Sequence, residues 1–413
     1  MSRRFKNMNR NNVIDLLSKL DTLNKELCSN DDVRAIITHW LFSPLSKIPF
    51  LSATIRNEFW SLINGLNINS YENYVKENIY YDIHQSIIPF YDIPFPPPKK
   101  PRFRFIDIFA GIGGFRIAMQ KNSGKCVFSS EWDNDAKKTY ENNYGEVPFG
   151  DIRKISETQI PDHDVLCAGF PCQPFSLAGV SARNSRKIAH GFLCETQGTL
   201  FFDIIRIAKE KKPKVLFLEN VKNIVTHDGG KTFKTIRNAI YDLNYSFNFK
   251  LIDSSPLVPQ RRVRCYMVCI RNDATPFVFP EIKGPPLPLR SILEDNISEE
   301  YTISDKLWDG HKRRTISNLQ RGNGFTAFCA DLDKPANTIV ARYGKDGKEC
   351  LIPQNERNPR MLSPRECARL QGFPDNFIIS VSKTKAYKQF GNSIAVPVVT
   401  KIGSQIAKII DKI

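Results

Sequence analysis

The stretch FRFIDIFAGIGGFRIAMQK, residues 103–121, decides the fold class. Residues 103–109 form a nearly continuous apolar run, which is typical of a strand buried on both faces of a parallel sheet. The glycine-rich AGIGG follows at 110–114, and the apolar spacing of 115–121 predicts a helix. A strand, a tight glycine loop and a helix in this order are the opening unit of a doubly wound α/β fold.

The same alternation continues along the chain. Apolar runs at 125–130, 164–170 and 214–220 predict further strands, and 200–210 predicts a helix between the last two. We therefore expect a Rossmann-like α/β domain over residues 98–270, completed by an amphipathic helix within 386–413.

Two regions depart from this rhythm. Residues 1–97 have helical apolar spacing and run into a proline-rich linker, so we expect a helical N-terminal extension. Its role stays open between a DNA-contacting arm, a folding cap and a promoter-binding regulator, and simple packing is favoured. Residues 271–360 are rich in Pro, Gly, Arg and Lys, and predict a smaller, irregular domain over 271–385.

The composition restricts the class of partner. The 413 residues carry a formal net charge of +16, which favours a nucleic acid over the alternative of a merely soluble basic protein. None of the ten cysteines forms a CxxC pair, so we expect free thiols and no metal site. Without a signal peptide or an apolar run of membrane length, the interpretation is a cytoplasmic, nucleoid-associated protein and no membrane partner.

Polar residues at the predicted strand ends indicate a nucleotide-like cofactor. The loop with Gly111, Gly113 and Gly114 can bring backbone N–H groups close to a ligand, although a purely structural turn has the same pattern. Glu131 ends the second strand, where a carboxylate can bind ribose hydroxyls, and Trp132 offers a ring face to an adenine. Asp151 could reach the adenine amino group. The spacing alone does not separate NAD from S-adenosylmethionine.

A cysteine lies between two prolines in GFPCQPFS, residues 169–176, directly after a predicted strand. Cys172 is either a buried thiol in a turn or a nucleophile on a loop stiffened by Pro171 and Pro174. Glu219 ends the next strand, so a thiol and a carboxyl group can face one pocket. For Cys167 and the other cysteines we expect small buried apolar residues.

Taken together, these segments resemble those of the bacterial cytosine-C5 DNA methyltransferases of restriction-modification systems. The resemblance rests on an ordered set of segments: FIDIFAGIGGFRIAM, EWDNDA, GDI, GFPCQPFS, LFLENV, QRRVRCYMV, RECARLQGFPD and QFGNSIAVPV. It implies that Cys172 attacks C6 of cytosine, that Glu219 binds and protonates N3, and that Arg262 and Arg264 support the site and the phosphate of the flipped nucleotide. It also implies an S-adenosylmethionine site that includes Phe109, Glu131, Trp132, Asp151, Ile152, Pro171, Asn392 and Ser393.

The chemistry agrees with these roles. Addition of a thiolate to C6 converts the ring into an enamine, which makes C5 reactive toward a methyl sulfonium. Glu219 must carry a proton to neutralise N3, so we expect burial to raise its pKa. Because C5 and C6 are inaccessible in a stacked duplex, the base must be flipped out.

Target recognition is expected in the smaller domain. Basic residues in 311–324 and 337–352 suit phosphate and guanine contacts, although a solvated loop surface has the same composition. The DNA-contact hypothesis concerns Arg313, Arg314, Arg321, Arg342 and Lys345. ARYGKDGKECLI, residues 341–352, resembles the recognition segment of family members that act on CCGG.

Three further expectations complete the prediction. We expect double-stranded DNA as substrate, a monomer, and a cognate restriction endonuclease as functional partner without a stable complex. A tRNA substrate is the alternative, but the long basic insert argues against it. A DNA-binding role of the N-terminal helices in autoregulation could coexist with catalysis.

Overall fold

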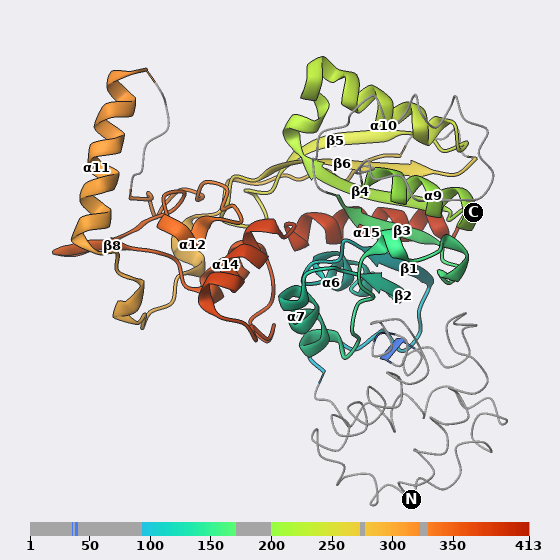
Figure 1. Ribbon diagram of the computed structural model, residues 1–413, viewed down its shortest axis with the longest axis horizontal. Coiled ribbons are helices and arrows are strands. Elements are labelled where there is room, and N and C mark those ends of the chain that lie inside the picture. The colour runs from blue at the N-terminus through green and yellow to red at the C-terminus, as the bar shows by residue number, and fades with distance from the viewer. Residues whose placement is uncertain are drawn as a thin grey trace, which may run out of the picture.

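The computed structural model describes residues 35, 38–39, 93–170, 200–272, 277–322 and 329–412. Its centre is a six-stranded sheet in the order β2-β1-β3-β4-β6-β5 (Figure 1). The strands are β1 (Phe103–Ile108), β2 (Gly124–Ser130), β3 (Val165–Gly169), β4 (Val215–Val221), β5 (Asn248–Asp253) and β6 (Val263–Ile270). The first four pair in parallel, and β6 is antiparallel to both β4 and β5. This confirms the predicted Rossmann-like α/β fold.

Alternation along the strands explains why helices cover both faces. In β1, Phe105 belongs to the buried cluster on one face, whereas Ile106 and Ile108 belong to the cluster on the other. The first face packs against α6 (Gly114–Gln120) and α15 (Val396–Ile410), and the second against α9 (Phe201–Lys211) and α10 (Lys231–Tyr241). α7 (Asn134–Tyr144) follows β2 and begins at the N-cap Asp133, whose side chain accepts from two backbone N–H groups.

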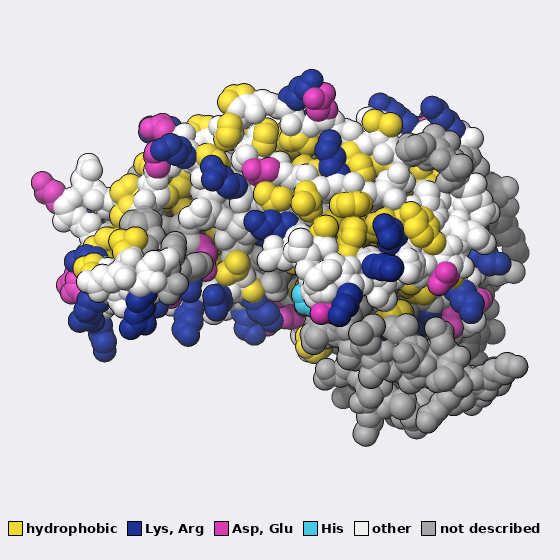
Figure 2. All heavy atoms as spheres, turned by 90° about the horizontal axis from the view of Figure 1, so that it is seen from above, with side chains coloured by type: hydrophobic (Ala, Val, Ile, Leu, Met, Phe, Trp, Pro, Cys, Tyr) yellow, Lys and Arg dark blue, Asp and Glu magenta, His cyan; other side chains and the backbone are white. Residues whose placement is uncertain are grey.

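The smaller part of the molecule lies on the left in Figure 1. It contains α11 (Asp305–Gln320), α12 (Tyr343–Asp346), β7 (Ile352–Gln354), β8 (Arg357–Arg360), α13 (Pro364–Leu370) and α14 (Lys383–Asn392). The sequence predicted an irregular region here, and the structure adds the long helix α11 to it. Figure 2 shows Lys and Arg side chains gathered along the lower left edge, on this part of the molecule. Short 3-10 helices complete the described chain at Ile152–Lys154, Glu157–Gln159, Lys222–Val225, His227–Gly230, Leu289–Ile292 and Glu299–Tyr301.

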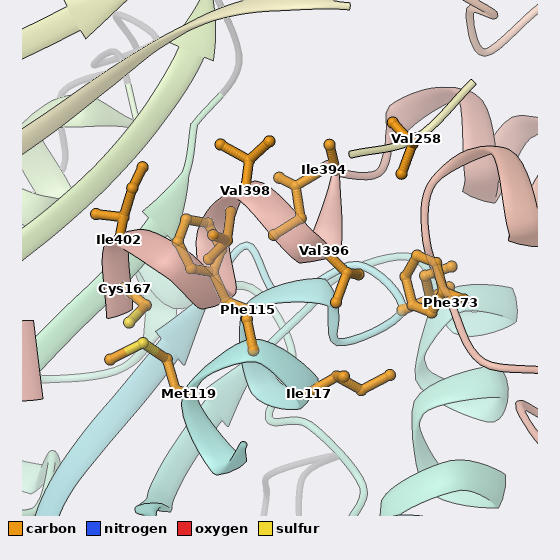
Figure 3. Packing of buried hydrophobic residues seen from close by; sticks show 14 of the residues in the cluster. Phe115, Ile117, Met119, Cys167, Val258, Phe373, Ile394, Val396, Val398 and Ile402 are labelled. Atoms are coloured by element: carbon orange, nitrogen blue, oxygen red, sulfur yellow. The ribbon is translucent and has the colours of Figure 1, made fainter. Parts of the chain in front are cut away.

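The C-terminal helix α15 is part of the core of the sheet domain. Its residues Val396, Val398 and Ile402 are fully buried and face Phe115 and Met119 of α6 (Figure 3). A segment distant in sequence therefore covers α6, the helix that follows the glycine loop. Just before α15, Ile394 packs closely against Gly114 of this loop.

Candidate active site

A cavity of about 660 Å³ opens at the carboxyl ends of the parallel strands. This is the edge at which doubly wound sheets bind ligands. Most of the predicted site residues line it: Phe109, Gly111, Gly114, Glu131, Trp132, Asp151, Ile152, Glu219, Arg262, Arg264, Asn392 and Ser393. Gly113 does not, and Pro171 and Cys172 lie outside the described residues.

The glycine loop forms one wall of the cavity. Gly111 has a φ of +55°, and a Cβ at this position would meet nothing within 4 Å, so its backbone borders open space. Gly113 serves packing instead, because a Cβ there would lie 2.3 Å from the Tyr144 ring. Phe109 also has a positive φ of 56°, which is strained for a residue with a bulky side chain. The backbone thus leaves β1 in a conformation that few non-glycine residues adopt.

Glu131 is fixed at the end of β2. Its Oε2 accepts a hydrogen bond from the Gly111 N–H at 2.8 Å, and its Oε1 accepts from the Asp133 N–H at 2.8 Å. Burial raises the pKa of Glu131, and the two backbone hydrogen bonds oppose that shift. A carboxylate has further lone pairs, so it can still accept from a hydroxyl-bearing ligand in the cavity. Next to it, the Trp132 side chain is 77% exposed.

Asp151 has a different environment from the one expected. Arg153 Nε lies 2.9 Å from each Asp151 carboxylate oxygen, and this ion pair lowers the pKa of Asp151. The Arg153 guanidinium, which also lines the cavity, must therefore share the carboxylate with any ligand amino group. Ile152 is buried beside it.

Glu219 occupies the opposite side of the cavity, at the end of β4. It is 8% exposed, and its Oε1 lies 3.2 Å from Arg264 Nε of β6. Burial raises the pKa of Glu219, as expected from the sequence, although the positive charges of Arg264 and Arg262 oppose the shift. A carboxyl group in this environment holds a proton more readily than one in water.

The structure separates the two arginines that the sequence grouped together. Arg264 contacts Glu219, whereas Arg262 is 3% exposed and donates to the backbone carbonyls of Ile339, Gly391 and Ser393. Arg262 therefore connects β6 to the segment that carries Asn392 and Ser393. It holds the cavity wall together.

Asn220 is a cavity residue that the sequence analysis did not single out. Its side chain is buried, and Nδ2 donates to the Phe170 carbonyl at 2.9 Å while Oδ1 accepts from the Val221 N–H at 2.8 Å. Phe170 is the last described residue before Cys172. Asn220 thus ties the end of β4 to Phe170 at the end of the described segment before Cys172, and the LFLENV segment was the signal that could have identified it.

The cysteine prediction holds for most of the described positions. Cys167 and five others, Cys126, Cys265, Cys269, Cys350 and Cys367, are free and buried. It was wrong for Cys329, which is exposed and belongs to neither buried cluster. Among the described residues, no group of three or more His, Cys, Asp or Glu side chains could hold a metal ion.

The predicted DNA contacts lie on two helices of the smaller part. Arg313, Arg314 and Arg321 are exposed on α11 or at its end, and Arg342 and Lys345 are exposed at α12. Arg314 also makes contacts within the protein: its Nη2 lies 3.1 Å from His311 Nδ1 on the same helix, and its Nη1 lies 3.7 Å from the Asp346 carboxylate of α12. Part of its charge is therefore used within the protein.

A family model for C-5 cytosine-specific DNA methylases matches residues 103–408, which include the whole cavity. The chain belongs to this family. It is a C5 cytosine DNA methyltransferase, and the methyl donor of the family is S-adenosylmethionine.

Two relatives of this methyltransferase are similar over most of its length. The Type II methyltransferase M.SsoII of Shigella sonnei is 48% identical over 335 residues, 79% of this chain and 86% of the relative. The Type II methyltransferase M1.ScrFI of Lactococcus lactis subsp. cremoris is 48% identical over 327 residues, 77% and 82% of the two chains. The crystal structure of the S. pombe Dnmt2 methyltransferase shares the fold, with a TM-score of 0.59, 18% identity, and coverage of 75% of this chain and 99% of the other.

No single helix in the described part of the methyltransferase is long and apolar enough to cross a membrane. By length and composition alone, the bent pair of α14 and α15 passes the same test when taken together.

Proposed function

We propose that Cys172 is the nucleophile of this methyltransferase and that Glu219 protonates N3 of the target cytosine. The carrying observation is the buried Glu219 carboxyl group with its raised pKa, at the cavity wall that Asn220 ties to the residue preceding the cysteine loop. The Cys172 thiolate forms a bond to C6, C5 then takes the methyl group, and loss of the C5 proton allows the C6–S bond to break and the thiolate to leave. Because C5 and C6 must reach this cavity, the cytosine is flipped out of the duplex.

We further propose that S-adenosylmethionine occupies the part of the cavity between the glycine loop and β2. The open space beside Gly111, the acceptor oxygens of Glu131 and the exposed Trp132 ring fit a ligand with an amino acid tail, a ribose and an adenine. The bound cofactor supplies an electrophilic methyl sulfonium. The protein's residues bind and orient it: Glu131 accepts from the ribose hydroxyls, and Asn392 and Ser393 form the wall behind.

A trapping experiment tests the nucleophile. Duplex DNA with 5-fluorocytosine at the target position should form a covalent adduct after methylation, because fluorine cannot leave as a proton does. Cys172→Ala should abolish the adduct and methyl transfer, while DNA binding persists because it depends on phosphate contacts. Cys329→Ala, which removes an exposed thiol of the smaller part, should leave the adduct intact. An adduct of normal yield in Cys172→Ala would contradict the assignment.

We propose CCGG as the target site. The support is the resemblance of residues 341–352 to the recognition segment of CCGG-specific members, together with the exposure of Arg342 and Lys345 at α12. Both side chains can bind O6 and N7 of guanine in the major groove. Bisulfite sequencing of DNA from cells that express the protein should locate 5-methylcytosine within CCGG. Methylation found only at other sites would exclude this target.

The biological setting follows from the same proposal. Double-stranded DNA is the substrate, and the enzyme acts as a monomer that protects the DNA from a cognate restriction endonuclease without forming a stable complex with it. The names of the relatives, Type II methyltransferases, support this setting. DNA from expressing cells should resist an endonuclease that cuts the methylated site, and tRNA from the same cells should carry no additional 5-methylcytosine.

A further inference from the structure

A short part of the N-terminal region is buried against the edge of the central sheet. Ala35, Thr38 and His39 are 1%, 3% and 3% exposed, and they lie beside β2, as the blue ribbon piece in Figure 1 shows. These residues precede the segment matched by the family model, which begins at residue 103. The N-terminal side of this contact therefore lies outside the segment that the family model matches.

Two side chains of this segment accept hydrogen bonds from the backbone of the sheet domain. The Ser129 N–H of β2 donates to His39 Nε2 at 3.1 Å, and the Val147 N–H donates to Thr38 Oγ1 at 3.0 Å. Ser129 and Val147 are both buried. Without these acceptors, two backbone N–H groups would be buried and unpaired, which is unfavourable.

The arrangement specifies the chemical form of the imidazole. Nε2 accepts from Ser129, and Nδ1 lies 2.8 Å from the Ala35 carbonyl, which can only accept. His39 is therefore the neutral tautomer with its proton on Nδ1. Glu146 Oε2 lies 3.5 Å from Nε2, but this carboxylate is already paired with Arg116 through two hydrogen bonds.

The two anchored segments lead directly to cofactor-site residues. Phe149 N–H donates to the Ser129 carbonyl at 2.9 Å, and Glu131 N–H donates to the Phe149 carbonyl at 2.8 Å, so the end of β2 pairs with the chain around Phe149. One segment continues into Glu131 and Trp132, and the other into Asp151. The His39 ring also packs against Phe149, with the two ring centroids 4.8 Å apart.

We propose that Thr38 and His39 are positioning residues for cofactor binding. They hold the end of β2 and the chain at 147–149 in register, so that the Glu131 carboxylate meets the cofactor at a fixed position. The inference rests on the proposed role of Glu131 in binding the cofactor. Part of the N-terminal extension thereby contributes to cofactor binding in the methyl transfer reaction.

The test compares substitutions that remove an acceptor with substitutions that keep one, all in the full-length chain. Thr38→Val and His39→Leu remove the acceptors, whereas Thr38→Ser and His39→Gln retain an acceptor atom at a similar place. Titration calorimetry gives the Kd for S-adenosylmethionine, and single-turnover methylation at saturating cofactor gives the chemical rate. We expect a Kd about tenfold higher in Thr38→Val and His39→Leu. The rate at saturation and the Kd of the two conservative variants should be close to wild type.

A stability control separates positioning from general weakening of the fold. Ile240→Val trims a fully buried side chain of α10 outside the cavity lining, so it should lower the Tm without changing the Kd. If His39→Leu does not fold, Thr38→Val decides. A wild-type Kd in Thr38→Val and His39→Leu, with a raised Kd in Glu131→Ala, would overturn the inference alone. A wild-type Kd in Glu131→Ala would instead overturn the proposed cofactor site.

Discussion

The ends of β2 and β4 each bring a buried glutamate to the same cavity, but their carboxyl groups are held differently. Glu131 accepts two backbone N–H hydrogen bonds, from Gly111 and Asp133. Among the described residues, no backbone N–H donates to the Glu219 carboxyl group, which faces the side chain of Arg264 at 3.2 Å. Burial raises the pKa of both groups.

This difference separates binding from proton transfer. Backbone N–H groups can only donate, so they favour a carboxylate that keeps its charge and its orientation. Burial raises the pKa of the Glu219 carboxyl group and favours the protonated form that a general acid requires, although Arg264 and Arg262 oppose the shift. The neighbours therefore suit Glu131 to hold a ligand and Glu219 to donate a proton.

The largest expected effect concerns Glu219. Glu219→Ala removes the proposed proton donor for N3, so the single-turnover rate of methyl transfer at saturating cofactor should fall by about 10²- to 10⁴-fold. The Kd for S-adenosylmethionine should remain unchanged, because Glu219 lies on the opposite side of the cavity from Glu131. A change in that Kd comparable with the loss of rate would remove the distinction between the two carboxyl groups.

Glu131→Ala should have the opposite pattern. Loss of the acceptor for ribose hydroxyls should raise the cofactor Kd by about 10- to 100-fold, since hydrogen bonds to charged groups are among the stronger ones. The single-turnover rate at saturating cofactor should stay close to that of the wild type. Equilibrium dialysis with labelled S-adenosylmethionine measures the first quantity and rapid quench the second. A slow chemical step in the saturated variant would argue against a pure binding role.

Asn220, next to Glu219 in β4, tests whether a side-chain hydrogen bond to Phe170 is needed for activity. Asn220→Ala and Asn220→Asp both remove the N–H donor to the Phe170 carbonyl, and the aspartate keeps the size of the side chain and the acceptor for Val221. We expect both to lower the single-turnover rate by about tenfold, because Phe170, which precedes the proposed nucleophile Cys172, loses its anchor to β4. Wild-type activity in Asn220→Asp would show that the donor is dispensable.

The pH dependence tests the protonation of Glu219 directly. Since the proposed mechanism needs the protonated form of Glu219, the methylation rate should fall as the pH rises through the raised pKa of this group. Arg264 lowers that pKa, so Arg264→Met should move the alkaline limb of the profile to higher pH. Arg261→Met changes an exposed neighbour and serves as the control. An alkaline limb at the same pH in Arg264→Met and the wild type would contradict the electrostatic coupling.

Local sequence patterns predicted much of the sheet and of the cavity. Apolar runs and glycine loops are local signals, and the carboxyl ends of parallel strands necessarily share one edge, so Glu131 and Glu219 could be assigned to one site. The raised pKa of Glu219 was expected from the role that the family resemblance implies, because a residue that protonates N3 must itself carry a proton. Cys172 stays a prediction, because it lies outside the described residues.

Contacts between distant segments could not be read in the same way. The partners of Arg262 are backbone carbonyls more than 70 positions away in the chain, and any residue type supplies a carbonyl. The Arg153–Asp151 pair depends on a 3-10 turn that the GDI segment does not specify. Thr38 and His39 carry no motif, and the backbone N–H groups that donate to them, those of Val147 and Ser129, lie 109 and 90 positions away in the chain.

The Arg262 contacts have a consequence for engineering new specificities. Ile339 belongs to the region expected to choose the target, whereas Gly391 and Ser393 flank the cofactor cavity, and one guanidinium binds all three. A recognition segment transplanted from a relative must therefore offer a carbonyl at the position of Ile339, whatever its side chains read in the DNA. Chimeras joined downstream of Ile339 keep the native hydrogen bonds of Arg262. In chimeras joined upstream, these bonds depend on how well the foreign backbone reproduces the position of the Ile339 carbonyl.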